Sequence, residues 1–200
     1  MELMSQYEDN HFDLAVVDPP YGIGVDGQKE SIKGKKSDRK GHKKKGWDSN
    51  IPNSNYFKEL FRISKNQIIW GANYFVEHLF KGSKGWIVWD KGQHGLTMSD
   101  CELAFSSFNK PTRVKVINRV ALLQDGTIHP TQKPIKLYDW IFQNYANEGD
   151  KILDTHLGSG SIAIASHYAG LHLTACEIDE DYFQESVERI KRETAQETLF

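Results

Sequence analysis

The chain has 200 residues, of which 38% are hydrophobic and 12% aromatic, and its formal net charge at pH 7 is −2. This length suits one domain, residues 1–200, and the two cysteines, Cys101 and Cys176, form neither a metal-binding spacing nor a disulfide framework. With no metal site, signal peptide or membrane span visible in the sequence, we expect a soluble cytoplasmic protein.

The first clear element is an apolar run, Phe12–Val17, which predicts a buried strand after a short helix within residues 1–8. The strand must end at the following Asp-Pro-Pro-Tyr, because proline has no N–H for a sheet ladder and holds the preceding residue extended. Ligands bind at the carboxyl ends of strands in open α/β sheets. The mouth of a crevice is therefore predicted at Asp18, Pro19, Pro20 and Tyr21. An ordinary turn with a capping aspartate is the alternative.

A basic arm follows this turn. Residues 28–46 contain nine Lys or Arg residues and two acids, a net charge of +7, so the rest of the chain carries −9. Few apolar residues interrupt the arm, which predicts a mobile loop. Its cations would meet nucleic-acid phosphates beside the crevice, although a solvated loop that only aids solubility is the alternative. These cations are Lys29, Lys33, Lys35, Lys36, Arg39, Lys40, Lys43, Lys44 and Lys45.

The middle of the chain alternates helix and strand. Ser54 is a candidate N-cap for an amphipathic helix, and residues 67–70 form the next predicted strand. A short helix over residues 74–80 and a strand over residues 86–89 follow. Such alternation is typical of an α/β fold with a doubly wound, mostly parallel twisted sheet.

Two further strands are predicted over residues 102–105 and 113–116. They flank a turn, so we expect a hairpin that forms an antiparallel edge of the sheet. Residues 129–134 then read His-Pro-Thr-Gln-Lys-Pro before a predicted helix over residues 135–147. Read alone, this hexapeptide indicates only a helix entrance stiffened by proline.

The last unit, residues 151–177, is a strand, a glycine loop, a helix and a second strand, and an amphipathic helix closes the chain. Such a unit binds an adenine nucleoside, with Glu177 at the second strand's tip placed to hold ribose hydroxyls. NAD is one candidate ligand. Asp154 opposes it, because this carboxylate would repel a pyrophosphate yet suits the ammonium and sulfonium of S-adenosylmethionine.

Three of these segments resemble motifs of the amino-group DNA methyltransferases. Asp-Pro-Pro-Tyr at residues 18–21 resembles motif IV in the form usual in adenine-N6 enzymes. Residues 129–134 resemble motif X, and residues 154–160 resemble motif I, with Thr155 and His156 in place of its common proline and phenylalanine. The order IV, X, I is that of the β class, and residues 89–91 and 100–103 are similar to phage-type members.

The resemblance implies a Rossmann-like fold and transfer of a methyl group from S-adenosyl-L-methionine to adenine N6 of a base flipped out of double-stranded DNA. Asp18 and the Pro19 carbonyl would grip the amine hydrogens, and Tyr21 would stack on the base. Asp18 and Asp154 would then lie at neighbouring strand tips. Residues 106–128 leave room for only a minimal target-recognition region. A homodimer is possible.

The resemblance also implies a set of cofactor-binding residues around the glycine loop and along motif X. They are Asp154, Thr155, Leu157, Gly158, Ser159, Gly160, Ser161, Glu177, Ile178, His129, Thr131 and Lys133. Three alternatives stay open: cytosine-N4 transfer with the same geometry, RNA as the substrate, and a catalytically silent DNA-binding remnant.

Overall fold

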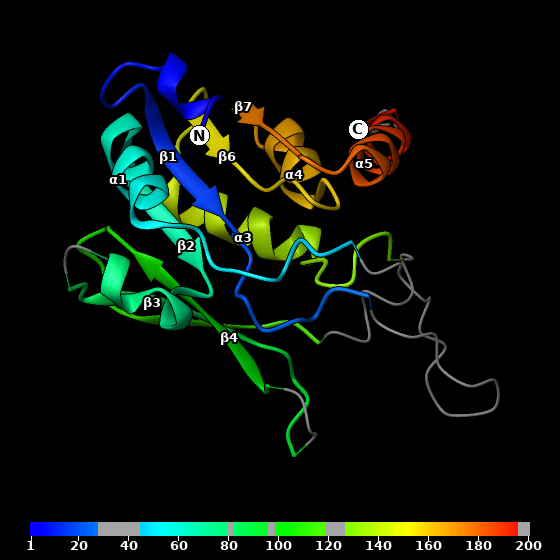
Figure 1. Cartoon of the computed structure of the whole chain (residues 1–200), viewed down its shortest axis with the longest axis horizontal. Helices are drawn as coiled ribbons and strands as arrows, with labels where there is room; N and C mark the ends of the chain where they lie inside the picture. The colour runs from blue at the N-terminus through cyan, green and yellow to red at the C-terminus, as the bar shows by residue number, and fades with distance from the viewer. Residues whose placement is uncertain (28–44, 80–81, 96–98, 119–126, 196–200) are drawn as a thin grey trace.

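The computed structural model describes residues 1–27, 45–79, 82–95, 99–118 and 127–195, and these form one seven-stranded sheet in the order β5-β3-β4-β2-β1-β6-β7 (Figure 1). The strands are β1 (Phe12–Val17), β2 (Ser64–Trp70), β3 (Gly85–Asp90), β4 (Cys101–Ser106), β5 (Arg113–Val116), β6 (Lys151–Asp154) and β7 (His172–Ala175). The strands expected from the sequence are thus all present in the described residues.

Strand directions confirm a mostly parallel sheet. β1 pairs in parallel with β2 and β6, β6 with β7, and β3 with β5. β4 is antiparallel to both of its neighbours, β2 and β3. The predicted edge hairpin is wrong, because β3 lies between the two strands that were expected to pair with each other. Ala104 and Phe105 explain the difference: both are buried, as an interior strand requires.

The helices lie close to their predicted positions. They are α1 (Ser54–Ile63), α3 (Ile135–Tyr145), α4 (Ser161–Tyr168) and α5 (Glu180–Thr194). Asn53 caps α1 in place of Ser54, since its side chain accepts a hydrogen bond from the Tyr56 N–H. The helix predicted over residues 74–80 is instead two short 3-10 turns, Ala72–Tyr74 and Val76–His78.

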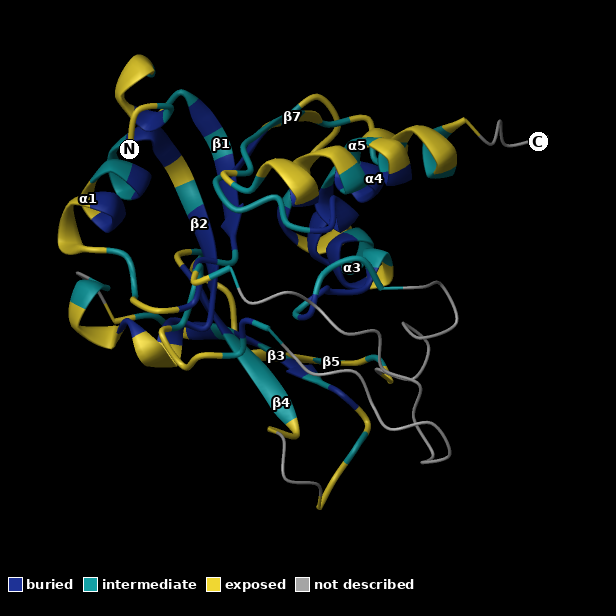
Figure 2. Cartoon of the chain, turned by 45° about the vertical axis from the view of Figure 1, so that its right-hand side comes forward, coloured by how far each residue is buried: buried dark blue, intermediate teal, exposed yellow. Residues whose placement is uncertain are grey.

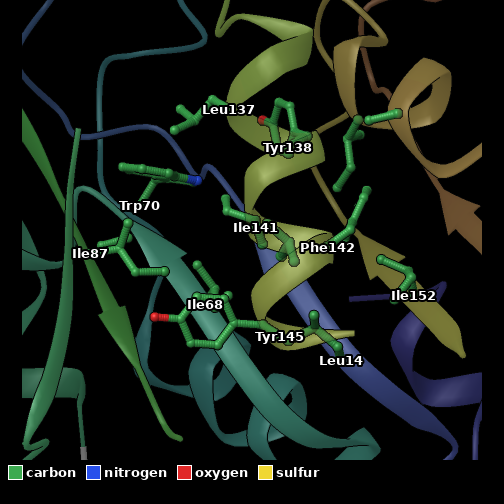
Figure 3. Packing of buried hydrophobic residues seen from close by; sticks show 14 of the residues in the cluster. Leu14, Ile68, Trp70, Ile87, Leu137, Tyr138, Ile141, Phe142, Tyr145 and Ile152 are labelled. Carbon is green, nitrogen blue, oxygen red and sulfur yellow. The ribbon is translucent and has the colours of Figure 1, made fainter. Parts of the chain in front are cut away.

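Helices cover both faces of the sheet. Leu14 and Val16 of β1 pack with α3 and α4, whereas Ala15 and Val17 pack with α1, as the alternation of strand side chains requires. Trp70 of β2 lies between the sheet and α3 (Figure 3). Buried residues accordingly concentrate in β1, β2 and the inner sides of the helices (Figure 2). Because β1 and β6 are parallel neighbours, their carboxyl ends lie at the same edge of this packed sheet.

Several predictions fall on residues outside the described ranges. They include eight of the nine basic-arm cations, all except Lys45, and residues 119–126 of the predicted recognition region. Among the described helices, none has the length and apolar character needed to cross a bilayer.

Candidate active site

The two motifs expected to converge are neighbours in the sheet. β1 and β6 pair in parallel, with Leu14 opposite Ile152 and Ala15 opposite Leu153. Asp18 follows β1 directly and Asp154 ends β6, so both carboxylates lie at the same edge. The sequence prediction that Asp18 and Asp154 sit at neighbouring strand tips is confirmed.

On the β1 side, Asp18 is bound by two groups. The Tyr21 hydroxyl donates a hydrogen bond to Asp18 Oδ1 at 2.6 Å, and Lys133 Nζ forms an ion pair with Asp18 Oδ2. The Tyr21 ring stacks on Tyr74, with 5.0 Å between ring centroids and 16° between planes. Tyr21 therefore contacts a protein ring where the sequence predicts contact with a base.

Gly71, directly after β2, makes this arrangement possible. Its φ of +66° lies in the left-handed region, which favours glycine. A Cβ at this position would overlap the Tyr21 ring. The backbone of residue 71 thus forms the surface against which Tyr21 lies, a role that the sequence did not reveal.

Lys133 joins Asp18 to a second carboxylate. Its Nζ lies 3.1 Å from Glu102 Oε2, and Lys91 Nζ lies 3.0 Å from Glu102 Oε1. Asp18, Lys133, Glu102 and Lys91 thus form an acceptor-side charge cluster with no net charge. Lys133, two residues before α3, thus extends toward the β1 tip and contacts Asp18 and Glu102, whereas the sequence predicts that it contacts the cofactor.

Burial and pairing oppose each other in this cluster. Burial raises the pKa of Asp18, and the neighbouring Lys133 offsets part of that increase. Burial also acts to raise the pKa of Glu102, but Lys133 and Lys91 outweigh it, so that pKa lies below its ordinary value. The pKa of Lys133 is raised, because its two carboxylate partners outweigh its own desolvation.

On the β6 side, Asp154 is 2% exposed and burial raises its pKa to about 7. Its Oδ1 accepts a hydrogen bond from the His156 N–H at 2.9 Å. Burial lowers the pKa of His156 to about 4, so its imidazole is neutral at pH 7. Thr155 Oγ1 lies 2.7 Å from the Tyr56 hydroxyl and 2.9 Å from His156 Nδ1. The two substituted positions of the glycine motif thus form a polar contact with α1.

The glycine loop is tied to the tip of β7. The Gly158 N–H donates to Glu177 Oε2 at 2.8 Å, and the Asp179 N–H donates to Glu177 Oε1 at 3.0 Å. A carboxylate accepts about four hydrogen bonds, so Glu177 keeps capacity for ligand hydroxyls. Ile178 is 97% exposed beside it, an apolar side chain available to cover a ring.

Two predicted cofactor residues brace the loop from within. Ser159 Oγ lies 3.1 Å from Ser161 Oγ. Arg189 of α5 donates to the Ser159 carbonyl at 2.8 Å and to Ser161 Oγ at 2.9 Å. The Ser159 carbonyl and the Ser161 hydroxyl therefore hold the loop to α5 through Arg189.

Motif X divides between the two sides. His129 packs 4.5 Å from the Tyr182 ring and 5.1 Å from the Trp47 ring, and a Cβ on Gly158 would lie 3.9 Å from it. The Thr131 hydroxyl lies 3.1 Å from His129 Nδ1. His129 and Thr131 are thus beside the glycine loop, whereas Lys133 is beside Asp18.

Lys45 also differs from its expected role. Its Nζ lies 2.5 Å from Asp179 Oδ1 and 2.7 Å from Asp181 Oδ2, and 4.5 Å from the centre of the Tyr182 ring. Both carboxylates flank the start of α5, next to Glu177. Lys45 is therefore paired within the protein, so a phosphate contact by this residue would have to displace two carboxylates.

The β6 side has the electrostatic character of a cation-binding site. A carboxylate whose burial raises its pKa to about 7 is stabilised when a ligand places a positive charge next to it. Glu177 supplies acceptors for hydroxyl groups, and the glycine loop supplies close-approaching backbone. Asp154, Glu177 and the loop are thus the residues that fit a nucleoside carrying a sulfonium.

Comparisons with known proteins identify the family and the fold. A family profile described as DNA methylase matches residues 28–188. The Type II methyltransferase M.HpaI of Haemophilus parainfluenzae is 34% identical over 65 residues, which are 32% of this chain and 21% of that protein. The matched segment thus spans about a fifth of that relative's length.

Solved structures share the fold. The M1.HpyAVI–SAM complex superposes with a TM-score of 0.59 at 19% identity, covering 94% of this chain and 91% of that one. PvuII DNA methyltransferase, described as cytosine-N4-specific, superposes with a TM-score of 0.62 at 11% identity, covering 97% and 87%. At these identities the likeness establishes the architecture.

Proposed function

The chain belongs to the DNA methylase family, and from this membership we propose that it transfers a methyl group from S-adenosyl-L-methionine to N6 of an adenine flipped out of DNA. The observation that carries the proposal is the adjacency of Asp18 and Asp154 on paired strands. Asp-Pro-Pro-Tyr at residues 18–21 favours adenine over cytosine as the acceptor.

The β6 side would hold the methyl donor. S-adenosyl-L-methionine supplies a sulfonium-bound methyl group, and the acceptor nitrogen bonds its carbon while the S–C electron pair stays on sulfur. Asp154 would neutralise the donor's positive charge, Glu177 would hold its ribose hydroxyls and Ile178 would cover its adenine ring. His129 and Thr131, beside the same loop, would border the methionine end.

The β1 side would hold the acceptor. The Asp18 carboxylate and the Pro19 carbonyl would accept the two hydrogens of the amine, which localises its lone pair on nitrogen. The Tyr21 hydroxyl must leave Asp18 Oδ1 for this to happen, and the freed ring can then stack on the base for about 1–3 kcal/mol. The nitrogen would release its extra proton to Asp18, whose pKa is raised by burial.

The direct test is an assay with purified protein, labelled S-adenosyl-L-methionine and unmodified genomic DNA. Digestion to nucleosides and mass spectrometry should find N6-methyladenine. If the product is N4-methylcytosine, the acceptor base is cytosine and the proposed mechanism still applies. If label is found only with RNA, the substrate is RNA and not DNA. A chain that neither transfers label nor binds the donor in calorimetry would be a silent remnant.

We propose that the basic arm supplies the contact with DNA phosphates. Its charge is the basis, since residues 28–46 carry +7 on an otherwise acidic chain. Replacing Lys33, Lys35, Lys36 and Lys40 with glutamine should weaken DNA binding and flatten the dependence of log K on log salt by roughly one unit per lost phosphate contact. An unchanged slope in fluorescence anisotropy titrations would contradict the assignment.

A further inference from the structure

The acceptor-side charge cluster contains Lys133, a charged side chain that is almost completely removed from solvent. The Lys133 side chain is 2% exposed, and its Nζ contacts Asp18 and Glu102 while lying 5.2 Å from the centre of the Trp70 ring. Removing an ammonium from water costs several kcal/mol, which only close partners can offset. Its two carboxylates and the ring face supply this compensation, so the ammonium is held at one place.

The cluster is assembled by strand direction. β1 and β3 end at the edge that carries the site, and Asp18 and Lys91 directly follow them. β4 runs the other way, so Glu102, near its start, reaches the same edge opposite Trp89. Lys133 enters from the segment before α3, two residues ahead of the helix, where the following Pro134 favours an extended backbone. Residues that are far apart in the sequence, Lys91 and Lys133, therefore meet at the Glu102 carboxylate.

We propose that Lys133 is a positioning residue for methyl transfer, which holds Asp18 by Oδ2 so that Oδ1 faces the acceptor amine, while Glu102 and Lys91 hold Lys133 in place. This inference rests on the proposed function. The two oxygens of Asp18 have different partners: a buried lysine on Oδ2 and the hydroxyl of Tyr21 on Oδ1. In the proposed reaction the Tyr21 hydroxyl leaves Oδ1, whereas the enclosed ammonium of Lys133 stays on Oδ2.

A merely structural role would tie α3 to the sheet without affecting the Asp18 carboxylate. The two roles differ in what they do to its titration. Loss of the Lys133 charge should make Asp18 harder to ionise, whereas loss of the Glu102 charge should make it easier, because Glu102 repels a charge on Asp18. Opposite shifts from two variants of one ion pair are not expected from loosened packing.

The other titratable groups near Asp18 need separate treatment. The tyrosine pKa values there are raised by burial, so these rings stay neutral between pH 5 and 9, whereas Asp154 titrates within that window. Measuring each variant also in an Asp154→Asn background removes this contribution. The groups that face Asp18 are Lys133, Glu102, Tyr21, Tyr56, Tyr138 and Asp154.

The experiment follows the Asp18 carboxyl by NMR in protein labelled with ¹³C at aspartate Cγ, assigned by its loss in Asp18→Asn. Lys133→Met should raise the titration midpoint of Asp18 by more than about one pH unit. Lys133→Arg, which keeps the positive charge, should leave the midpoint close to its wild-type value, and Glu102→Gln should lower it. Lys136→Met, which replaces an exposed lysine in the first turn of α3, should change nothing.

Kinetics of the same variants give the second readout. Lys133→Met should lower kcat about 10- to 100-fold, as a misplaced catalytic group does, with the Kd for S-adenosyl-L-methionine changed less than twofold. An unmoved Asp18 midpoint, or a weakened donor Kd with unchanged kcat, would overturn the inference. If Lys133→Met does not fold, Glu102→Gln and Lys133→Arg still decide it. A wild-type chain without transfer activity contradicts the proposed function, while the titration still reports whether Lys133 controls this carboxylate.

Discussion

The two sides of the candidate site, at the tips of β1 and β6, surround a buried carboxylate in opposite ways. Asp18 is paired with a cation of the protein itself, Lys133, within a cluster of balanced charge. Asp154 accepts a hydrogen bond from the His156 main-chain N–H, and burial raises its pKa to about 7. The comparison teaches that one side has its electrostatics built in, whereas the other is complementary to a positive charge that a ligand brings.

Asp18→Ala should have the strongest effect, because it removes the carboxylate of the β1 side and leaves the β6 side unchanged. Removing the carboxylate proposed to bind the acceptor amine should lower methyl transfer by at least about 10³-fold, while the affinity for S-adenosyl-L-methionine stays intact. Label transfer and calorimetry measure the two quantities. Asp9→Ala is the matched control, an exposed aspartate before the start of β1. Retained transfer by Asp18→Ala would remove the mechanism.

Gly71→Ala tests the acceptor side through shape alone. The added methyl group would overlap the Tyr21 ring and displace it from its position beside the acceptor site, and the φ of +66° at residue 71 adds backbone strain. A displacement of this size should cost transfer about 10²-fold with donor affinity unchanged. Gly82→Ala is the control, because a Cβ there meets nothing within 4 Å. Wild-type rates in Gly71→Ala would show that the Tyr21 position does not matter.

The donor side should show its character in pH dependence. A bound cation would lower the pKa of Asp154 from about 7, so below pH 7 binding must first remove its proton. The Kd for S-adenosyl-L-methionine should therefore rise about tenfold per unit as pH falls below 7, and stay flat above it. Calorimetry from pH 5.5 to 8.5 measures this.

His156, with a pKa of about 4, stays neutral throughout most of that range. Asp154→Asn should abolish the pH dependence and bind weakly at every pH. A wild-type affinity that does not change between pH 5.5 and 8.5 would mean that no cation settles beside Asp154.

The smallest expected effect concerns the contact between α1 and the glycine motif. Tyr56→Phe removes the hydrogen bond to Thr155 Oγ1, which keeps its contact with His156. The free energy of unfolding should fall by about 1 kcal/mol in urea denaturation, with transfer nearly unchanged. Tyr7→Phe, at a partly buried ring away from the site, serves as the control. A large loss of donor affinity instead would give Tyr56 a direct part in the pocket.

Local chemistry predicted much of this site. Proline at positions 19 and 20 ended β1 where the sequence indicated, and the glycine loop with Asp154 and Glu177 lies at the tips of β6 and β7. Such features depend on neighbouring residues in the chain. The adjacency of Asp18 and Asp154 was also predictable, because the resemblance to the amino-group DNA methyltransferases implied it.

The rest depended on contacts distant in sequence. The apolar pattern of residues 102–105 reads alike at an edge and in the interior, so it could not reveal that β4 lies between β2 and β3. With β4 misplaced, Glu102 could not be assigned to the site. Lys133 was then grouped with its motif neighbours, although its partners come from β1 and β4. No spacing in the sequence signals such an ion pair.

The position of β1 between β2 and β6 also bears on how the chain is made. During synthesis β2 emerges soon after β1, but β6 begins only at Lys151, so one edge of a hydrophobic strand stays unpaired until most of the chain is translated. Open strand edges invite pairing with other chains, and distant pairings form slowly. Ribosome-bound fragments that end before residue 151 should therefore depend on chaperones. A chain whose synthesis stops before β6 should aggregate and not accumulate as a soluble fragment.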